Sequence, residues 1–188
     1  MKKVIIASLA MLCIVACNDV ASVNILVDSR DGKKYKTLKI GEQVWMAENL
    51  NYDAEGGKCY DNNPENCEQY GRLYDWDVAK KACPSGWHLP SEKEWKTLVN
   101  FAGGEKRAGK KLKTKSGWNG NGNGTNNYGF SALPGGSYLL EDAIFDGVGL
   151  DGDWWSFSGS VCLIGYSHDG ILVTFIGNGL FSVRCVQD

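Results

Sequence analysis

The stretch CPSGWHLPSEKEW, residues 83–95, brings a thiol, an imidazole and two carboxylates close together in the sequence. Cys83 and His88 have the residue types of a thiolate–imidazole pair, in which a histidine activates a cysteine nucleophile. Such a pair needs a free thiol with a lowered pKa and a third group that orients the base. The catalytic interpretation therefore depends on the state of Cys83 and on the elements that position these residues.

The end of this stretch has the features of a helix start. Ser91 and Glu94 have the spacing of a capping box. Pro90 lies just before them, which agrees with a helix start at this point because proline cannot join a helix interior. The apolar residues that follow recur at i, i+3, i+4 and i+7, which predicts one buried helical face. They are Trp95, Leu98, Val99 and Ala102. Glu92 and Glu94 are therefore interpreted as residues that favour the positive end of the helix dipole.

The N-terminus has the pattern of an export signal, in which MKK precedes a short apolar run. The sequence Ile14-Val15-Ala16-Cys17 resembles a bacterial lipobox, whose cysteine receives diacylglycerol and becomes the mature N-terminus. We therefore expect a signal peptide over residues 1–16, a lipidated tether over 17–27 and one domain over 28–188. The expected location is the bacterial cell envelope, at the outer membrane or cell surface, with the lipid on Cys17 in the membrane.

The amino-acid composition and net charge exclude some classes of protein. The formal net charge is −2, so the chain lacks the basic footprint of a nucleic-acid-binding protein. Seven Trp, eight Tyr and 24 Gly indicate a domain rich in loops and aromatic residues rather than a helical bundle. In an exported protein, cysteines more often form disulfides than metal sites. Cys13 leaves with the signal and Cys17 carries lipid, so five of the seven cysteines remain, and one of these stays free or pairs between chains.

Three other patterns predict local structure. Two alternating runs around Gly41-Glu42 predict a β-hairpin with a type II′ turn. Apolar spacing predicts a short helix within residues 73–82. The β-rich runs VCLIGY, ILVTFI and FSVRCV are separated by Asp-Gly and Asn-Gly turns. These turns predict a C-terminal three-stranded antiparallel meander.

Five stretches in order resemble the Fibrobacter succinogenes major paralogous domain, from about residue 28 to the C-terminus. They are DSRDGKKYKTLKIGEQVWMAENLNY, CYDNNPENCEQYGRLYDW, KACPSGWHLPSEKEW, GNGTNNYGFSALPGG and FSVRCV. That family is in turn similar to the C-type-lectin-like and sulfatase-modifying-factor group. The resemblance implies an α+β, C-type-lectin-like fold, with two short helices against a small twisted antiparallel sheet. It also implies a long irregular loop region, about residues 103–160, that carries any ligand site.

The resemblance implies that Cys83 bonds Cys185 on the last strand. We then expect a second bond, Cys59–Cys67, and a free thiol at Cys162. An oxidised Cys83 has no thiolate for His88 to activate, so no catalytic residue is expected. Sulfatase-modifying enzymes bind copper through a cysteine pair that does not map onto this chain, so their activity does not transfer.

Acidic residues offer a weak case for calcium. Asp146, Asp151 and Asp153 could supply oxygen ligands, but the distal Glu of an EF-hand is absent. The sugar-binding motifs of C-type lectins do not occur in the loop region either. Turn chemistry accounts for these acids, and we expect no metal and no cofactor.

Aromatic residues give the remaining functional indication. Trp118, Trp154 and Trp155 lie in or beside the loop region, where exposed rings grip sugars or partner chains in many binding modules. The alternative is that they fill the core of a loop-rich domain. The sequence favours a non-catalytic binding or adhesion module for polysaccharide or envelope protein. A structural envelope protein without a specific ligand, or an enzyme of the sulfatase-modifying-factor type, is the alternative.

Overall fold

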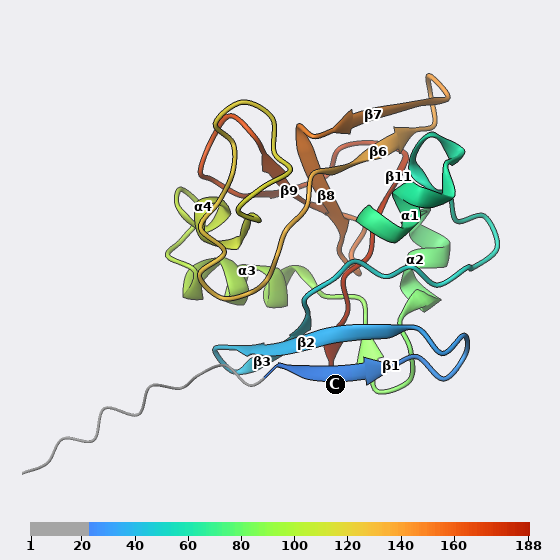
Figure 1. Ribbon diagram of the computed structural model, residues 1–188, viewed down its shortest axis with the longest axis horizontal. Helices are drawn as coiled ribbons and strands as arrows, with labels where there is room; N and C mark the ends of the chain where they lie inside the picture. The colour runs from blue at the N-terminus through green and yellow to red at the C-terminus, as the bar shows by residue number, and fades with distance from the viewer. Residues whose placement is uncertain (1–22) are drawn as a thin grey trace, which may run out of the picture.

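The computed structural model describes residues 23–188, so the expected signal peptide and the expected lipidation site, Cys17, lie outside the described residues. The described chain is a mixed α+β domain, mostly sheet with a few short helices (Figure 1). One sheet lies at the bottom of this view and the other at the top, with helices beside and between them. None of the helices within residues 23–188 has the length and apolar character needed to cross a bilayer.

The first sheet joins the two ends of the described chain. Its strand order is β1-β2-β3-β12-β5. The strands are β1 (Asn24–Val27), β2 (Lys34–Ile40), β3 (Gln43–Met46), β5 (Trp87–His88) and β12 (Val186–Gln187). The predicted hairpin is confirmed: β2 pairs with β3, and Gly41 adopts a φ of +61°, which suits the first turn position. The expected tether, residues 17–27, includes β1, which pairs with β2 along all four of its residues.

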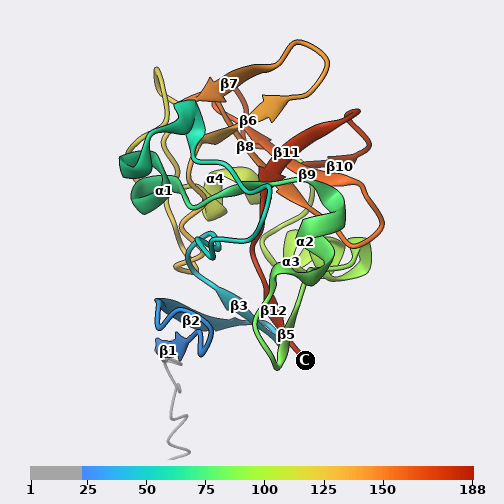
Figure 2. The same cartoon turned by 90° about the vertical axis from the view of Figure 1, so that its right-hand side faces the viewer.

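The second sheet has the order β10-β9-β8-β11-β6-β7, and β4 also pairs with β11 (Figure 2). Its strands are β4 (Leu73–Tyr74), β6 (Gly135–Leu139), β7 (Ile144–Val148), β8 (Asp151–Trp155), β9 (Val161–Gly165), β10 (Leu172–Thr174) and β11 (Gly179–Ser182).

The predicted C-terminal meander is only half present. Strands β9 and β10 form an antiparallel pair, as expected, but β11 does not lie beside β10. It pairs in parallel with β8 and antiparallel with β6 and β4. The physical reason is burial: all four residues of β11 are buried, whereas β10 is partly exposed. A strand that is buried on both faces is most stable at the centre of a sheet, and the partly exposed β10 remains at the edge.

Helices are short and more numerous than the two expected. They are α1 (Pro64–Tyr70), α2 (Trp76–Ala82), α3 (Glu92–Phe101) and α4 (Ala108–Leu112), with a 3-10 turn η1 (Tyr60–Asn62). The capping box at α3 is confirmed, since Ser91 and Glu94 accept each other's backbone N–H groups. The region 103–160 is not a long irregular loop, because it contains α4, β6, β7 and β8. Its longest irregular part is residues 113–134, which contains one isolated bridge, between Lys113 and Ala132.

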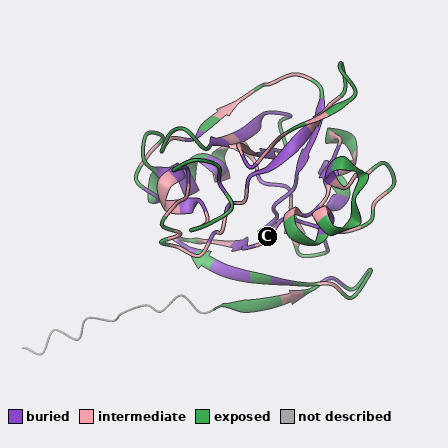
Figure 3. Ribbon diagram, turned by 45° about the horizontal axis from the view of Figure 1, so that its top comes forward, coloured by how far each residue is buried: buried purple, intermediate pink, exposed green. Residues whose placement is uncertain are grey.

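Buried residues concentrate on the central strands (Figure 3), and the core clusters that they form are rich in aromatic residues. Trp45 packs against Trp95 with ring centroids 4.9 Å apart, and Phe130 lies edge-on to both rings. A neighbouring cluster contains Trp155 and Phe181, whose centroids are 4.7 Å apart. Burying rings of this size supplies much of the hydrophobic stabilisation of a domain with such short elements.

Candidate functional site

The sequence stretch around His88 is structural. Cys83 forms a disulfide with Cys185, which ties the end of α2 to the segment between β11 and β12. The two ring nitrogens of His88 lie 2.8 Å from Glu94 Oε1 and 2.7 Å from Asp188 Oδ1. Burial disfavours the charged ring, but these hydrogen bonds outweigh it and raise the pKa of His88. His88 therefore links the start of α3 to the C-terminal residue, and no free thiol faces it.

The other cysteines also lie where they were expected. Cys59 is bonded to Cys67, which fastens α1 to the chain before η1. Cys162 is a free, buried thiol in β9, and burial raises its pKa. A thiol with a raised pKa carries little of the thiolate that nucleophilic attack requires.

All three tryptophans expected to contact a ligand are buried. Trp118 and Trp155 are 4% exposed and Trp154 is 0% exposed. Their indole nitrogens donate to internal acceptors: Trp118 to Ala132 O (3.1 Å), Trp154 to Asn49 Oδ1 (2.8 Å) and Trp155 to Tyr74 O (2.7 Å). They therefore occupy the core, which was the alternative to ligand contact, and none presents a ring face to solvent.

The acids of this region form no metal site. Within residues 23–188, no group of three or more His, Cys, Asp or Glu side chains is placed to hold a metal ion. Asp153 on β8 is 5% exposed, and its Oδ1 has no hydrogen-bond partner among the described residues. Burial, reinforced by the charges of Asp151 and Asp146, raises the pKa of Asp153 to about 7.

A groove of about 1420 Å³ opens on the described part of the chain. It lies between the β2–β3 hairpin, the C-terminal half of α1 and the segment 127–133. We call this the hairpin groove. Only residues 127–133 belong to the region where the sequence placed a ligand site. Sequence reasoning missed the groove because its three walls are far apart in the chain.

The floor of the hairpin groove is fixed by Asn49 and Arg184. Asn49 Oδ1 accepts from Arg184 Nη2 at 2.6 Å, from Arg184 Nε at 3.1 Å and from Trp154. Asn49 Nδ2 donates to Tyr70 O at 2.8 Å, which ties the end of α1 to the floor. The Arg184 guanidinium is fully buried and lies 4.3 Å from the Phe130 ring centroid. Burial lowers the pKa of Arg184 to about 9, so the group remains charged at neutral pH.

Aromatic side chains line opposite ends of the groove. Phe101 is 50% exposed and packs on Tyr128, with centroids 5.3 Å apart. Gly41 allows this ring to sit against the hairpin, since a Cβ there would lie 3.0 Å from Phe101 Cδ2. Tyr70 lines the other end, and its hydroxyl accepts from Gln69 Nε2 at 3.0 Å. Partly exposed rings of this kind offer faces on which a ligand can stack.

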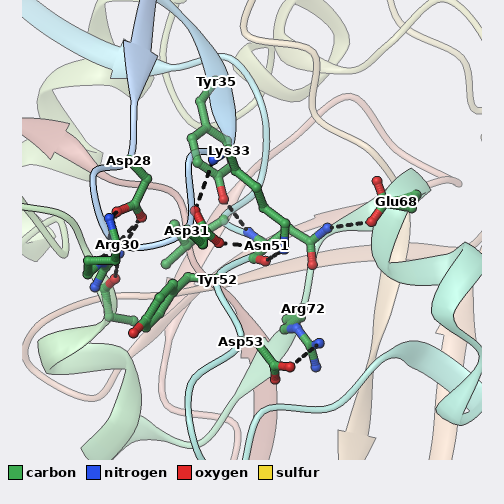
Figure 4. Close-up of polar contacts among 12 residues, drawn as sticks. Asp28, Arg30, Asp31, Lys33, Tyr35, Asn51, Tyr52, Asp53, Glu68 and Arg72 are labelled. Carbon is green, nitrogen blue, oxygen red and sulfur yellow. Dashed lines mark hydrogen bonds and ion pairs between the residues drawn. The ribbon is translucent and has the colours of Figure 1, made fainter.

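A polar corner lies at the α1 end of the groove (Figure 4). The Asn51 backbone N–H donates to the Tyr35 hydroxyl at 3.1 Å, and its carbonyl accepts from Lys33 Nζ. Asn51 Nδ2 donates to Glu68 Oε1 at 3.2 Å. Asn51 Oδ1 is buried and has no partner among the described residues. The ENLNY sequence just after β3 is the only sequence signal of this corner, and it specifies neither neighbour.

The fold and site together define a disulfide-bonded α+β domain. Its groove is lined by polar side chains and has aromatic side chains at its ends. A family model for the Fibrobacter succinogenes major domain matches residues 38–187, from within β2 to the last residue of β12. The chain therefore belongs to that family, as its sequence motifs indicated. No curated protein and no solved structure matches the chain at a significant level.

Proposed function

We propose that this chain is a non-catalytic binding module of the bacterial cell envelope, whose ligand lies in the hairpin groove. The expected anchor is a lipid on Cys17, and the expected ligand is a polysaccharide or an envelope protein. The groove itself carries the proposal: it has a hydrogen-bonded floor, partly exposed aromatic rings and polar side chains in its lining. Ligand sites typically combine apolar surface with a few polar groups that fix orientation.

The preorganised floor supports binding. Asn49 connects the groove to Arg184, Trp154 and Tyr70, so its amide is held in one orientation. The Cys59–Cys67 bond restrains α1, which supplies one wall. A site that is already ordered loses less conformational entropy when a ligand binds.

The lectin-like relationship is also a proposal. Several features fit the C-type-lectin-like and sulfatase-modifying-factor group. The last strand β12 returns between β3 and β5, a short helix precedes Cys83, and the Cys83–Cys185 bond closes the chain. An experimental structure of this chain that superimposes on that group would test it. A connectivity different from that group would contradict it.

A second candidate function is structural. The burial of Trp118, Trp154 and Trp155 favours a stable envelope component without a specific ligand. An enzyme of the sulfatase-modifying-factor type is the third candidate. The disulfide at Cys83 and the buried thiol of Cys162 argue against a thiolate nucleophile in the described part of the chain.

Variants of the groove's aromatic residues separate the first two candidates. Purified lipidated protein in detergent would be screened on an array of envelope polysaccharides, and any ligand found would be titrated calorimetrically. We expect Tyr70→Ala and Phe101→Ala to weaken binding about tenfold with small changes in melting temperature. Phe175→Ala is the matched control, since this ring is 71% exposed and lies outside the groove. Absence of any polysaccharide or envelope-protein ligand for the wild type would favour the structural candidate.

A further inference from the structure

We propose that an exposed apolar face of β1 docks on the phospholipid bilayer and fixes the orientation of the anchored domain. This inference goes beyond the proposed function, but it uses the lipid on Cys17 that the proposed function includes. Its starting point is three aliphatic side chains, Val23, Ile25 and Val27, which we call the β1 face. They are 60%, 56% and 52% exposed, respectively.

Strand alternation places these side chains on one side of the sheet. Residues two apart in a strand point to the same face, and the residue between them points to the opposite face. Leu26, between Ile25 and Val27, packs against the buried cluster that contains its β2 partner Tyr35. The β1 face therefore points away from that cluster. Edge strands usually carry charges that prevent association, so an apolar row on this edge strand indicates a partner.

The position of Cys17 in the chain identifies the partner. Five residues, 18–22, separate Cys17 from Val23. Six residue steps span at most about 20 Å even when fully extended. A lipid on Cys17 therefore holds β1 within this distance of the bilayer. Figure 2 shows β1 at the lower edge of the domain, with the second sheet above it. The β1 face is thus an exposed apolar surface within reach of the membrane.

Charges beside the β1 face fit a phospholipid surface. Lys36 lies directly opposite Ile25, and Lys34 lies opposite Val27, so each pair shares a face. Both lysines are exposed, and neither β1 nor β2 contains an acidic residue. Glu48 lies 3.9 Å from the Lys36 ammonium, but both groups are exposed and such a pair is weak. Lysine stems can cover apolar surface while their ammonium groups reach lipid phosphates.

Other occupants fit this face less well. Two copies packed face to face would bring the lysines of both copies together, and like charges repel. A peptide that adds a strand would pair with the free backbone edge of β1, which no strand within residues 23–188 occupies. It would leave the β1 face exposed. A flat bilayer covers the face, and the depth is limited because the free N–H and C=O groups must stay hydrated at the headgroups.

Docking of the β1 face also determines where the hairpin groove lies. Strand β2 forms one wall of the groove and pairs with β1. Contact between the β1 face and the bilayer therefore holds the groove beside the membrane surface. The β6–β7 hairpin, at the opposite end of the domain in Figure 1, points away from the membrane. A ligand of the groove is then a molecule found close to the lipid headgroups.

The test maps lipid contacts of the purified lipidated protein in vesicles of phosphatidylethanolamine and phosphatidylglycerol. Part of the phospholipid carries a diazirine near the start of an acyl chain, and the light-induced labels are located by peptide mass spectrometry. We expect labels within residues 23–36 and none on β10, where Leu172 is 55% exposed. Crosslinking between copies is measured in the same samples.

Variants of the β1 face supply the second arm. The double variant Ile25→Thr and Val27→Thr should lower labelling of residues 23–36 about tenfold, because it removes aliphatic groups from the lipid. Thr keeps the β-branched shape, so the melting temperature should not change. Val23 is left in place because it also lines the groove. Leu172→Thr, an exposed aliphatic position on the edge strand of the other sheet, is the matched control and should leave labelling unchanged.

Three results would overturn the proposal. They are labelling centred on β10 or the β6–β7 hairpin, a double variant labelled as strongly as the wild type, and crosslinks between two β1 strands without lipid labelling. If Cys17 carries lipid and β1 is unlabelled, only this inference fails. If Cys17 carries no lipid, the expected anchor fails with it, while ligand binding by the groove is decided separately by Tyr70→Ala and Phe101→Ala.

Discussion

Replacing Asp153 by Asn should stabilise the protein at alkaline pH and have little effect at acid pH. Asp153 is buried on β8 with its Oδ1 unpaired, and the pKa of this carboxyl is raised to about 7. The first cause is burial, and the charges of Asp151 and Asp146 add to it. Asn has nearly the same shape as Asp but carries no charge. The substitution therefore measures the free-energy cost of ionising the buried side chain at position 153.

The sign follows from linkage between protonation and folding. The folded state holds the proton more tightly than the unfolded chain, whose Asp titrates near the ordinary value of 3.8. The contribution of Asp153 to stability is therefore fully present below about pH 4, declines as the pH rises to about 7, and is constant above that. A difference of about three pKa units corresponds to roughly 4 kcal/mol at most, since each unit is about 1.4 kcal/mol.

The assay is urea unfolding of wild type and Asp153→Asn at intervals between pH 4.5 and 8.5, with the disulfides oxidised. The difference in unfolding free energy should grow with pH in favour of the variant, by up to roughly 4 kcal/mol. Asp142→Asn, in the exposed turn between β6 and β7, is the control and should show no such growth. A difference that is independent of pH, or that favours the wild type at pH 8.5, would refute the reasoning.

Three further predictions concern the anchor, the disulfides and the core. Cys17→Ser should move the protein from the membrane fraction to the soluble fraction or leave it unprocessed; a wild-type protein of unmodified mass that needs no detergent would contradict lipidation. Removing the Cys83–Cys185 bond with paired Ala substitutions should cost up to roughly 4–5 kcal/mol in denaturant unfolding, because it closes a loop with a sequence separation of 102. Peptide mapping that finds a Cys162–Cys185 link would refute this pairing. Trp154→Ala should cost about 3–5 kcal/mol, and a loss below about 1 kcal/mol would argue against its burial.

Local sequence patterns correctly predicted the structural features that depend only on residues close together in the sequence. The capping box at Ser91 and the hairpin at Gly41 are determined by spacing within a few residues, and both are present. The disulfide pairing came from resemblance to a family rather than from spacing. The position of β11 could not be predicted, because which strand pairs with it depends on burial across the whole sheet.

The site was less predictable than the fold. A tryptophan beside glycines has the same local pattern whether its ring is buried or exposed, so Trp118 and Trp154 were ambiguous in the sequence. When they are buried, their indole N–H groups need internal acceptors, and Ala132 and Asn49 supply these from 14 and 105 residues away in the chain. The hairpin groove likewise combines three separate segments, and its polar corner depends on one amide contact between Asn51 and Glu68.

The most direct test of the central claim is hydrogen exchange of the full-length protein with and without the polysaccharide that binds it. We expect added protection in three separate segments, 33–51, 67–71 and 127–133, which form the groove. Strands β9 and β10, which lie outside the groove, should exchange at the same rate in both samples. Protection confined to β9 and β10, or absent from all three groove segments, would contradict the assignment of this groove as the binding site.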